Sequence, residues 1–572
     1  MYIDTVPNRN SRPAILLREG WREGKRVRKR TIANLTNWPP EKIKGLRLVL
    51  KNVPVVSPDE LFVIERSLPH GHVEIVLQVI RRLRLSALID PKPSRQRNLV
   101  LALIVQRLLQ PASKLATTRL WHTTTLASEL SLEDADSDDL YEAMDWLLQR
   151  QGRIEKKLAR QHLAEGDHVL YDLSSSYYEG QTSSLVRYGY SRDGKRGRPI
   201  IVYGVMADRA GCPVAVQAYP GNTGDPVTVP DQVETLRQRF GFQRVVLVGD
   251  RGLLTETRIR DLKRHPGLGW ISALRHTAIR QLVETQAVQL SIFDERHLAE
   301  VRTRAYPGER LVVCHNPMLA EYRRRKREDL LAATEEKLAK IAREVARRTK
   351  TPLLAPQIAE KVGRIKNRYK VAKHFELEIE DGHFKYARRT EAITREAQLD
   401  GFYILRTSGP DDRLPTAEVV RSYKNLTNVE RAFRSLKTVD LQIRPIRHRT
   451  ETRIRSHLFL CLLSYYVEWH LRRALAPLLF DDEDLEAHRA RRDPVLAAQP
   501  SESAKRKKTK RRTEDGLPIQ SFATLMAELG TRARHRCRTA SDPEGPTLQR
   551  LTEPTPLQQR AMELVKAFPV TK

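Results

Sequence analysis

Two short apolar runs, each ending in an aspartate, constrain the fold of this chain most. Val-Leu-Tyr at residues 169–171 precedes Asp172, and Val-Val-Leu-Val-Gly at residues 245–249 precedes Asp250. Runs of this length predict buried strands. A carboxylate at the end of a buried strand is costly to desolvate unless a cation or hydrogen-bond donors receive it. The sequence therefore predicts a sheet that brings both carboxylates to a polar site at strand ends.

A third acidic residue lies in a segment with helical periodicity. Apolar residues recur at three- and four-residue steps from residue 426 to residue 436, which predicts an amphipathic helix. At about 100° per residue, four polar side chains share one stripe beside the apolar face. They are Tyr423, Glu430, Arg434 and Lys437. The functional side chains of this helix are therefore expected to lie along one edge.

The three acidic residues together indicate a metal site. Carboxylates that converge from two strands and a helix provide the oxygen ligands that Mg²⁺ prefers, and Mn²⁺ accepts the same ligands. Two ions in one active site would clamp the attacking and leaving oxygens of an in-line displacement at phosphorus. We therefore predict that Asp172, Asp250 and Glu430 are catalytic and bind two Mg²⁺ or Mn²⁺ ions. Arg434 and Lys437 are suited to hold nucleic-acid phosphates beside them.

These segments resemble the DDE transposases of bacterial insertion sequences, in particular the group with a β-rich insertion and a Tyr-x2-Arg-x3-Glu-x6-Lys signature. Tyr423, Glu430 and Lys437 match that signature, whereas Leu426 occupies its arginine position and Arg434 is placed to substitute. The resemblance extends from the N-terminal arm to about residue 475. Further motifs that carry it are Tyr171–Ser175, Tyr188–Gly194, Gly221–Thr223, Gly249–Gly252 and Gly269–Arg275.

The resemblance implies both a fold and a reaction. The expected fold is α/β: an RNase H-like mixed-sheet core with a β-rich plus helical insertion, and a helical N-terminal DNA-binding region. The expected reaction is metal-dependent cleavage at the element ends, followed by attack of the exposed 3′-hydroxyl on target DNA. Its partners are double-stranded DNA, as terminal inverted repeats and as target. Coupled cleavage of two ends implies a homodimer.

Other candidate DNA contacts have two interpretations each. Trp270 is placed to stack on a base flipped out at the element end, as in relatives, or to pack in the core. Arg192 and Lys195 lie in a basic turn near Asp172, which either follows the DNA backbone or is a plain exposed hairpin.

The acidic residues also have purely structural alternatives. Asp172, which precedes a run of serines, could form a turn or a helix cap. Glu430 could complete a capping box that starts at Thr427. Asp250 could belong to an ordinary strand-to-helix turn. Asp225, which precedes a proline, is interpreted as a helix N-cap and is left out of the active site.

Composition fits a polyanionic partner. Lys plus Arg number 101 against 70 Asp plus Glu, giving a formal net charge of +31. The cysteines, Cys212, Cys314, Cys461 and Cys537, are far apart and suggest neither a zinc ribbon nor a disulfide framework. The start lacks the pattern of a signal peptide, and the most apolar helix, residues 457–471, is too short for a membrane span. We expect a bacterial cytoplasmic protein, associated with the nucleoid when bound.

The 179 residues between Asp250 and Glu430 are too many for a loop, so the sequence predicts an inserted subdomain. Within it, Asp381-Gly382 predicts a type I′ hairpin. The charged helix at residues 323–348 is either a coiled-coil arm or a helix that packs inside the insertion. Residues 501–514 are expected to be a disordered basic linker or a phosphate-binding tail.

The predicted organisation has six parts. These are a β-containing arm (1–70), a helical region that either binds DNA ends or is a plain helical bundle with a charged surface (71–165), the first part of the core (166–280), the insertion (281–415), the second part of the core with the Glu430 helix (416–475) and a C-terminal region with the basic linker (476–572). Two alternative functions remain at this point. One is an RNase H-like endonuclease or resolvase without strand transfer. The other is a captured transposase that only binds DNA.

Overall fold

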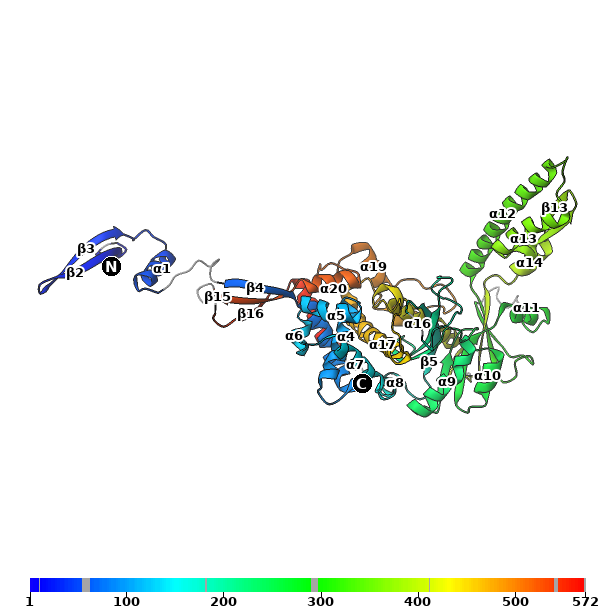
Figure 1. Ribbon diagram of the computed structural model, residues 1–572, viewed down its shortest axis with the longest axis horizontal. Coiled ribbons are helices and arrows are strands. Elements are labelled where there is room, and N and C mark those ends of the chain that lie inside the picture. The colour runs from blue at the N-terminus through cyan, green and yellow to red at the C-terminus, as the bar shows by residue number, and fades with distance from the viewer. Residues whose placement is uncertain are drawn as a thin grey trace. The chain divides into compact units, whose positions relative to one another are not determined.

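The computed structural model describes residues 1–9, 11–53, 62–180, 183–289, 297–410, 412–539 and 544–569. The chain divides into two units (Figure 1). One consists of Met1–Leu68 with Ala533–Glu553, and the other of Pro69–Arg532 with Pro554–Lys572. All residues expected to carry the chemistry belong to the second, larger unit.

The smaller unit is built on two three-stranded sheets. The first joins β1 (Tyr2–Val6), β2 (Ala14–Glu23) and β3 (Arg26–Asn34), and helix α1 (Pro40–Leu50) follows it. The second has the order β16-β15-β4, made of β4 (Phe62–Pro69), β15 (Ala533–Thr539) and β16 (Leu548–Leu551). Strand periodicity could not reveal this second sheet, because its members come from opposite ends of the sequence.

The larger unit contains an eight-stranded mixed sheet with the order β10-β11-β14-β9-β8-β5-β6-β7. Five of its strands are β5 (His168–Tyr177), β6 (Ile200–Ala207), β7 (Pro213–Pro220), β8 (Val245–Val248) and β9 (Leu268–Ala273). β5 is antiparallel to β6 and parallel to β8, and β8 is parallel to β9. Every residue of β6 is buried, as expected for an apolar strand covered on both faces. The mixed sheet with its many helices confirms the α/β class.

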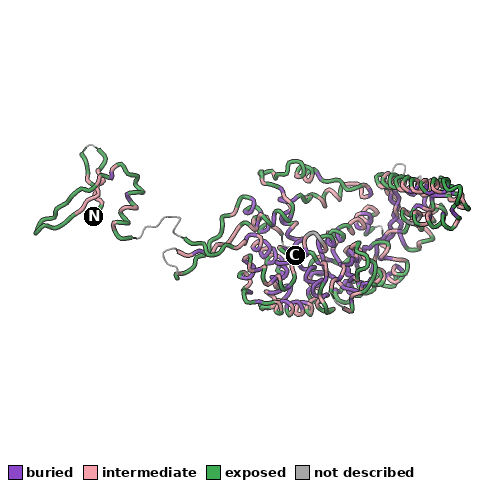
Figure 2. Tube along the Cα trace, turned by 45° about the horizontal axis from the view of Figure 1, so that its top comes forward, coloured by how far each residue is buried: buried purple, intermediate pink, exposed green. Residues whose placement is uncertain are grey.

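Helices from both sides of the sequence surround this sheet. Those before β5 are α2 (Gly71–Arg82), α3 (Leu85–Ile89), α4 (Arg95–Leu109), α5 (Lys114–Leu120), α6 (Leu126–Leu130), α7 (Ser137–Leu148) and α8 (Gln151–His162). Helix α17 (Glu451–Ala474) packs against α4, α7 and β7, and most of its residues are buried (Figure 2). The core is therefore shared between the N-terminal helices and the helix that follows Glu430.

In the described part of the chain, no single helix has the length and apolar character needed to cross a membrane. Helix α4 and the helical residues 114–123 pass the same criteria only as a pair, and the two are bent by 87°.

The insertion between β9 and α15 contributes to the sheet and also forms a separate helical arm. Strands β10 (Leu298–Val301), β11 (Arg310–His315) and β14 (Phe402–Thr407) extend the sheet. The arm contains α12 (Pro317–Arg347), α13 (Ala355–Tyr369), β12 (Phe375–Glu380) and β13 (His383–Arg388), with α11 (His276–Glu284) before it and α14 (Thr390–Ala397) after it.

The arm has its own apolar core, to which α12 contributes. Leu331, Leu338 and Val345 are buried against α13 and the β12–β13 hairpin, so of the two alternatives for this helix, packing inside the insertion is confirmed. The predicted hairpin is also present, since Glu380 pairs with His383. Its turn is not type I′, because φ is positive at Gly382 but not at Asp381.

The remaining helices lie between strands or near the C-terminus. They are α9 (Val229–Glu234), α10 (Glu256–Lys263), α15 (Thr416–Lys424), α16 (Leu426–Arg434), α18 (Leu485–Arg491), α19 (Glu502–Lys510), α20 (Phe522–Gly530) and α21 (Pro556–Ala567).

The disorder predicted for residues 501–514 is wrong, because most of them form α19. Ser501 caps this helix by accepting a hydrogen bond from the Ala504 amide, and the Lys507 ammonium donates to the Ala476 carbonyl at 2.7 Å. High charge alone predicted a solvated chain, whereas the cap and this hydrogen bond stabilise a helix.

Candidate active site

The two aspartates lie next to each other because their strands pair in parallel. The last register pair between β5 and β8 is Leu170 with Val248, and Asp172 and Asp250 each follow two residues later. Asp172 was predicted to end its strand, and this is wrong. It lies inside β5, which continues to Tyr177 in its pairing with β6. Because the serines after Asp172 are buried strand residues, the turn or cap alternative is wrong.

The Asp172 carboxylate is partly buried and feels both other acids. Burial raises its pKa to about 7, and the charges of Asp250 and Glu430 act in the same direction. The Leu173 amide, which donates to Oδ1 at 2.8 Å, and the positive charge of Arg192 oppose this rise. The three carboxylates therefore lie close enough to act on one another, and a bound cation would favour the ionised form of Asp172.

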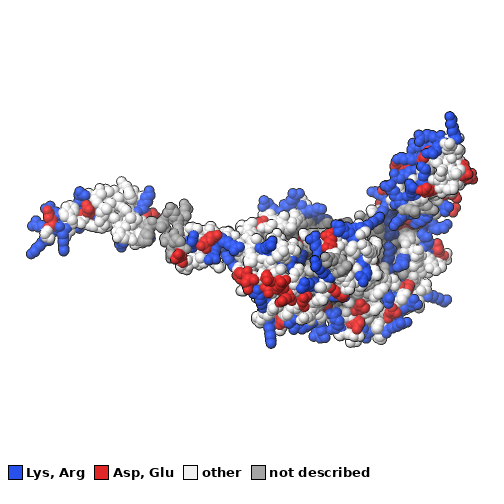
Figure 3. All heavy atoms as spheres, viewed as in Figure 1, with Lys and Arg blue, Asp and Glu red and all other residues white. Residues whose placement is uncertain are grey.

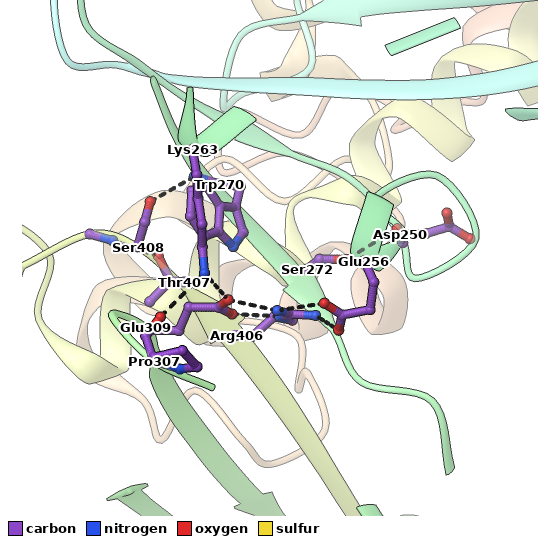
Figure 4. A network of polar contacts seen from close by, with 11 residues as sticks. Asp250, Glu256, Lys263, Trp270, Ser272, Pro307, Glu309, Arg406, Thr407 and Ser408 are labelled. Atoms are coloured by element: carbon purple, nitrogen blue, oxygen red, sulfur yellow. Dashed lines mark hydrogen bonds and ion pairs between the residues drawn. The ribbon is translucent and has the colours of Figure 1, made fainter. Parts of the chain in front are cut away.

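Asp250 is exposed and is held by the turn that follows it. Its Oδ1 accepts hydrogen bonds from the amides of Gly252 at 3.0 Å and Leu253 at 2.8 Å. Its backbone carbonyl accepts one from the Ser272 hydroxyl at 3.1 Å, while its carboxylate points away from that contact (Figure 4). The strand-to-helix turn is thus real, and it orients the carboxylate.

Glu430 is exposed on α16, which packs against β5 through its buried apolar face, Val429 and Phe433. The capping-box alternative is wrong, since α16 begins at Leu426 and the Thr427 hydroxyl donates back to the Lys424 carbonyl. On the described residues, no ion pair to Glu430 is found, so its carboxylate is available to a ligand.

Tyr423 lies close enough to all three acids for their charges to act on its phenol. The pKa of the phenol is raised to about 12, mainly by burial and in smaller part by the charges of Asp250, Glu430 and Asp172, while Arg251 lowers it.

The prediction of one continuous helix from Tyr423 to Lys437 is wrong. Tyr423 belongs to α15, and the hydrogen-bond ladder tightens at Asn425, whose carbonyl accepts from the Asn428 amide three residues later. After Arg434, which is exposed, the ladder widens to a π-helical segment, Ser435–Val439. The four side chains therefore do not form a single stripe at 100° per residue.

Lys437 lies in the π-helical segment and is engaged by a buried acid. Its ammonium is 2.9 Å from Oδ1 of Asp193, whose side chain is 1% exposed. Arg444 also pairs with this carboxylate, and the Tyr177 amide donates to its other oxygen at 3.1 Å. Burial lowers the pKa of Lys437, and Asp193 opposes this effect.

The basic turn near Asp172 is organised by Arg192. Its amide donates to the Ser175 hydroxyl at 2.9 Å, and its guanidinium pairs with Asp225. The N-cap interpretation of Asp225 is therefore wrong, because its carboxylate binds a side chain and makes no cap hydrogen bond. Lys195 is exposed, with its ammonium 4.3 Å from the centre of the Tyr177 ring.

Trp270 lies in the core on β9, with 2% of its surface exposed. Its Nε1 has no hydrogen-bond partner, and the Lys263 ammonium is 5.7 Å from the ring centre (Figure 4). A ring in this position has no face open to a base, so the core-packing alternative describes it better.

A buried charge network beside Asp250 was not predicted. Figure 4 shows the Arg406 guanidinium between Glu309 and Glu256, and Lys263 also contacts Glu309, at 2.8 Å. Both Arg406 and Glu309 are buried. The network ties α10 and β14 together next to the turn that holds Asp250, and no local sequence signal exists for partners so far apart in the chain.

Basic residues also gather on the insertion. Figure 3 shows Lys and Arg side chains over the surface of α12, of which Arg324, Arg325 and Lys326 are exposed. The charge excess of the sequence is therefore in part displayed on this helix.

Comparison with known proteins identifies the family. The family model described as "Transposase DDE domain" matches residues 165–467, more than half of the chain. A second model, the N-terminal domain of IS1634 family transposases, matches residues 3–54. No curated protein matches the chain.

A solved structure, the cryo-EM structure of a piggyBac transposase synaptic complex with hairpin DNA, is similar at 10% identity over 77% of this chain and 88% of that chain. Its TM-score of 0.24 is too low for a residue-level comparison. The family match, which covers the strands and helices that carry all three acids, is independent of that structure. The chain therefore belongs to the DDE transposases of insertion sequences, metal-dependent enzymes that bind and rearrange DNA.

Proposed function

We propose that Asp172, Asp250 and Glu430 are the catalytic acids of this transposase. The observation that carries the proposal is their convergence: the two aspartates follow the same register pair of β5 and β8, and Glu430 acts on Asp172 from α16. The alternative helix-cap and turn roles of Asp172 and Glu430 are not compatible with their surroundings. Strand cleavage at the element ends and strand transfer into target DNA are the reactions we assign to this site.

We further propose that the core is RNase H-like. The strand order β7-β6-β5-β8-β9, with an antiparallel meander followed by two parallel strands, supports this assignment. In such a sheet the carboxylates lie where neighbouring parallel strands stop pairing. The domain boundaries expected from sequence, at residues 70, 165, 280, 415 and 475, remain part of this proposal.

The three carboxylates fit two Mg²⁺ or Mn²⁺ ions. Both aspartates use Oδ1 to accept backbone hydrogen bonds, and among the described residues nothing donates to either Oδ2. Oxygen atoms of this kind are the ligands that these cations prefer. When bound, the cations supply charge neutralisation at the attacking and leaving oxygens.

The protein's own contribution is to fix these ligands. The amides of Leu173, Gly252 and Leu253 hold the aspartates from the backbone, so little reorientation is needed when a ligand binds. Arg192 lies near Asp172, and its pairing with Asp225 keeps the guanidinium beside the site.

We propose contacts to DNA for Tyr423, Arg434, Lys437, Arg192 and Lys195. Lys195 is exposed and can meet a phosphate directly, and Arg434 is also exposed on the helix that carries Glu430. Lys437 and Arg192 would first have to release their carboxylate partners, and Trp270 would have to leave the core to stack on a base.

We infer that two copies act together on paired ends, because cutting both ends of an element in one complex requires two active sites. Since the substrate is DNA, we place the enzyme in the bacterial cytoplasm at the nucleoid.

The test is cleavage of a labelled terminal-repeat duplex with Mg²⁺. Asp172→Asn, Asp250→Asn and Glu430→Gln should each abolish nicking while end binding stays nearly intact, because volume is kept and only the charge is lost. The matched control is Glu234→Gln, an exposed acid at the end of α9, which should nick like the wild type. Wild-type nicking by Glu430→Gln would contradict the assignment. Joined products with a target plasmid would separate transposition from a nuclease that only cuts.

A further inference from the structure

Away from the three acids, two histidines and a cysteine converge in the larger unit. His162 ends α8, Cys212 follows the β6–β7 turn and His470 lies on α17. The Cys212 Sγ is 3.8 Å from His162 Nε2 and 3.9 Å from His470 Nε2. The three potential ligand atoms all lie within 4.8 Å of one another.

These distances are close to those of a tetrahedral zinc site. With Zn–S near 2.3 Å and Zn–N near 2.0 Å, a tetrahedral ion separates sulfur and nitrogen by about 3.5 Å. The two sulfur–nitrogen distances would therefore have to shorten by only a few tenths of an ångström, and the two histidine nitrogens, which lie within 4.8 Å of each other, would have to move closer. The Tyr466 hydroxyl is 3.0 Å from His162 Nε2. The fourth ligand of the ion would therefore be this hydroxyl or a water.

The site is also prepared electrostatically. Burial favours the neutral form of both imidazoles, the form that binds metals. Asp208 lies close enough to raise the pKa of the Cys212 thiol beyond the effect of burial. Its carboxylate, together with a thiolate, would balance the two charges of a zinc ion, while Arg473 acts in the opposite sense.

A second cysteine–histidine cluster provides a contrast. Cys461 Sγ is 3.9 Å from His457 Nε2, and both residues are buried on α17. Here the nearby charges are Arg107 and Lys114, which act on both side chains and would repel a cation. Similar ligand atoms are thus present in two places, but only the Cys212 cluster has a carboxylate to offset a metal.

We propose that His162, Cys212 and His470 form a structural site for a thiophilic divalent cation, with Zn²⁺ as the natural occupant. It would join α8, the β6–β7 turn and α17, three elements distant in sequence. The turn it fixes also contacts α16, since Asn428 Nδ2 donates to the Arg209 carbonyl at 3.1 Å. This site differs from the three acids in ligand chemistry, because sulfur and imidazole select zinc whereas carboxylates select Mg²⁺.

The test uses the purified full-length protein and Co²⁺ as the spectroscopic probe. We expect one Co²⁺ per chain that gives a thiolate-to-cobalt charge-transfer band, is displaced by Zn²⁺ and resists a large excess of Mg²⁺. Cys461→Ser is the matched control and should keep the band, as should Asp172→Asn. Cys212→Ser should lose it, and His470→Asn should weaken Co²⁺ binding at least tenfold.

A second measurement does not depend on the folding of a variant. In wild-type protein under mild denaturant, Zn²⁺ should slow alkylation of Cys212 but not of Cys461, as mapped by mass spectrometry. The proposal is overturned if the wild type shows no thiolate band, if Cys212→Ser keeps it, if Cys461→Ser loses it, or if Zn²⁺ leaves Cys212 unprotected. None of these outcomes depends on DNA cleavage, so they stand apart from the assignment of the catalytic acids.

Discussion

The Lys437 ammonium lies 2.9 Å from Oδ1 of Asp193, a carboxylate with only 1% of its side chain exposed. A buried carboxylate that loses one partner leaves charge uncompensated. Lys437→Met should therefore lower the free energy of unfolding by about 2 to 4 kcal/mol, even with Arg444 still present. Urea unfolding measures this, and Lys195→Met, at an exposed lysine, should change stability by less than about 0.5 kcal/mol. Unchanged stability with weakened end binding would instead make Lys437 a plain phosphate contact.

Asp172 should make the metal-free protein less stable as the pH rises. Burial raises its native pKa from 3.8 to about 7, so the folded protein keeps a proton that the unfolded chain releases. Asp172 makes its full contribution to the free energy of unfolding below about pH 4, and this contribution is lost as the pH rises to about 7. With a chelator present, Asp172→Asn should therefore stabilise the protein by about 2 to 3 kcal/mol more at pH 8 than at pH 5. Equal effects at both pH values, or the same trend in Glu234→Gln, would contradict this.

Gly211 should be essential to the position of the Glu430 helix. Its φ is +89°, and a Cβ there would lie 2.7 Å from the Asn428 Cβ. Gly241 is a matched control, since it has the same φ of +89° but nothing within 4 Å of a Cβ. Gly241→Ala should cost about 1 to 2 kcal/mol for backbone strain alone, and Gly211→Ala about 1 to 3 kcal/mol more. Unfolding and nicking assays should show that only Gly211→Ala loses both stability and cleavage.

Helix α19 should add general affinity for DNA without reading its sequence. Lys508 and Lys510 are exposed on it, whereas Lys507 is engaged by Ala476 and Glu483. Replacing Lys508 and Lys510 with Gln should flatten the log–log salt dependence of duplex binding by about 0.9 per lost phosphate contact. The preference for terminal repeats should stay unchanged. Lys507→Gln should reduce stability without changing the salt dependence of binding. Loss of the preference for terminal repeats when Lys508 and Lys510 are both replaced would contradict a role in general affinity alone.

The three acids could be picked out as candidates because each lies in a local pattern. Asp172 and Asp250 end apolar runs, and Glu430 lies in a segment of helical periodicity that matches the family signature. The break in the helix at Asn425 could not be predicted, because it depends on a hydrogen bond three residues along rather than on side-chain polarity.

Contacts between residues remote in sequence could not be predicted either. Asp193 meets Lys437 and Arg192 meets Asp225 only once β5, β6 and the following helices have come together. Likewise, Cys212 has no cysteine or histidine at metal-binding spacing, because its neighbours His162 and His470 come from α8 and α17, which are far from it in the sequence.

The pairing of His315 with Phe402 has a consequence for how such a chain is assembled. These residues are opposite each other at the ends of antiparallel strands β11 and β14, and the Asn316 amide donates to the Gly401 carbonyl at 3.0 Å. Everything from α12 to α14 is thus, topologically, the loop of a β-hairpin. A two- to five-residue turn would close the same gap. The arm is therefore a module that a lineage could acquire or discard in one genetic event, and that a protein engineer could exchange without cutting into the sheet.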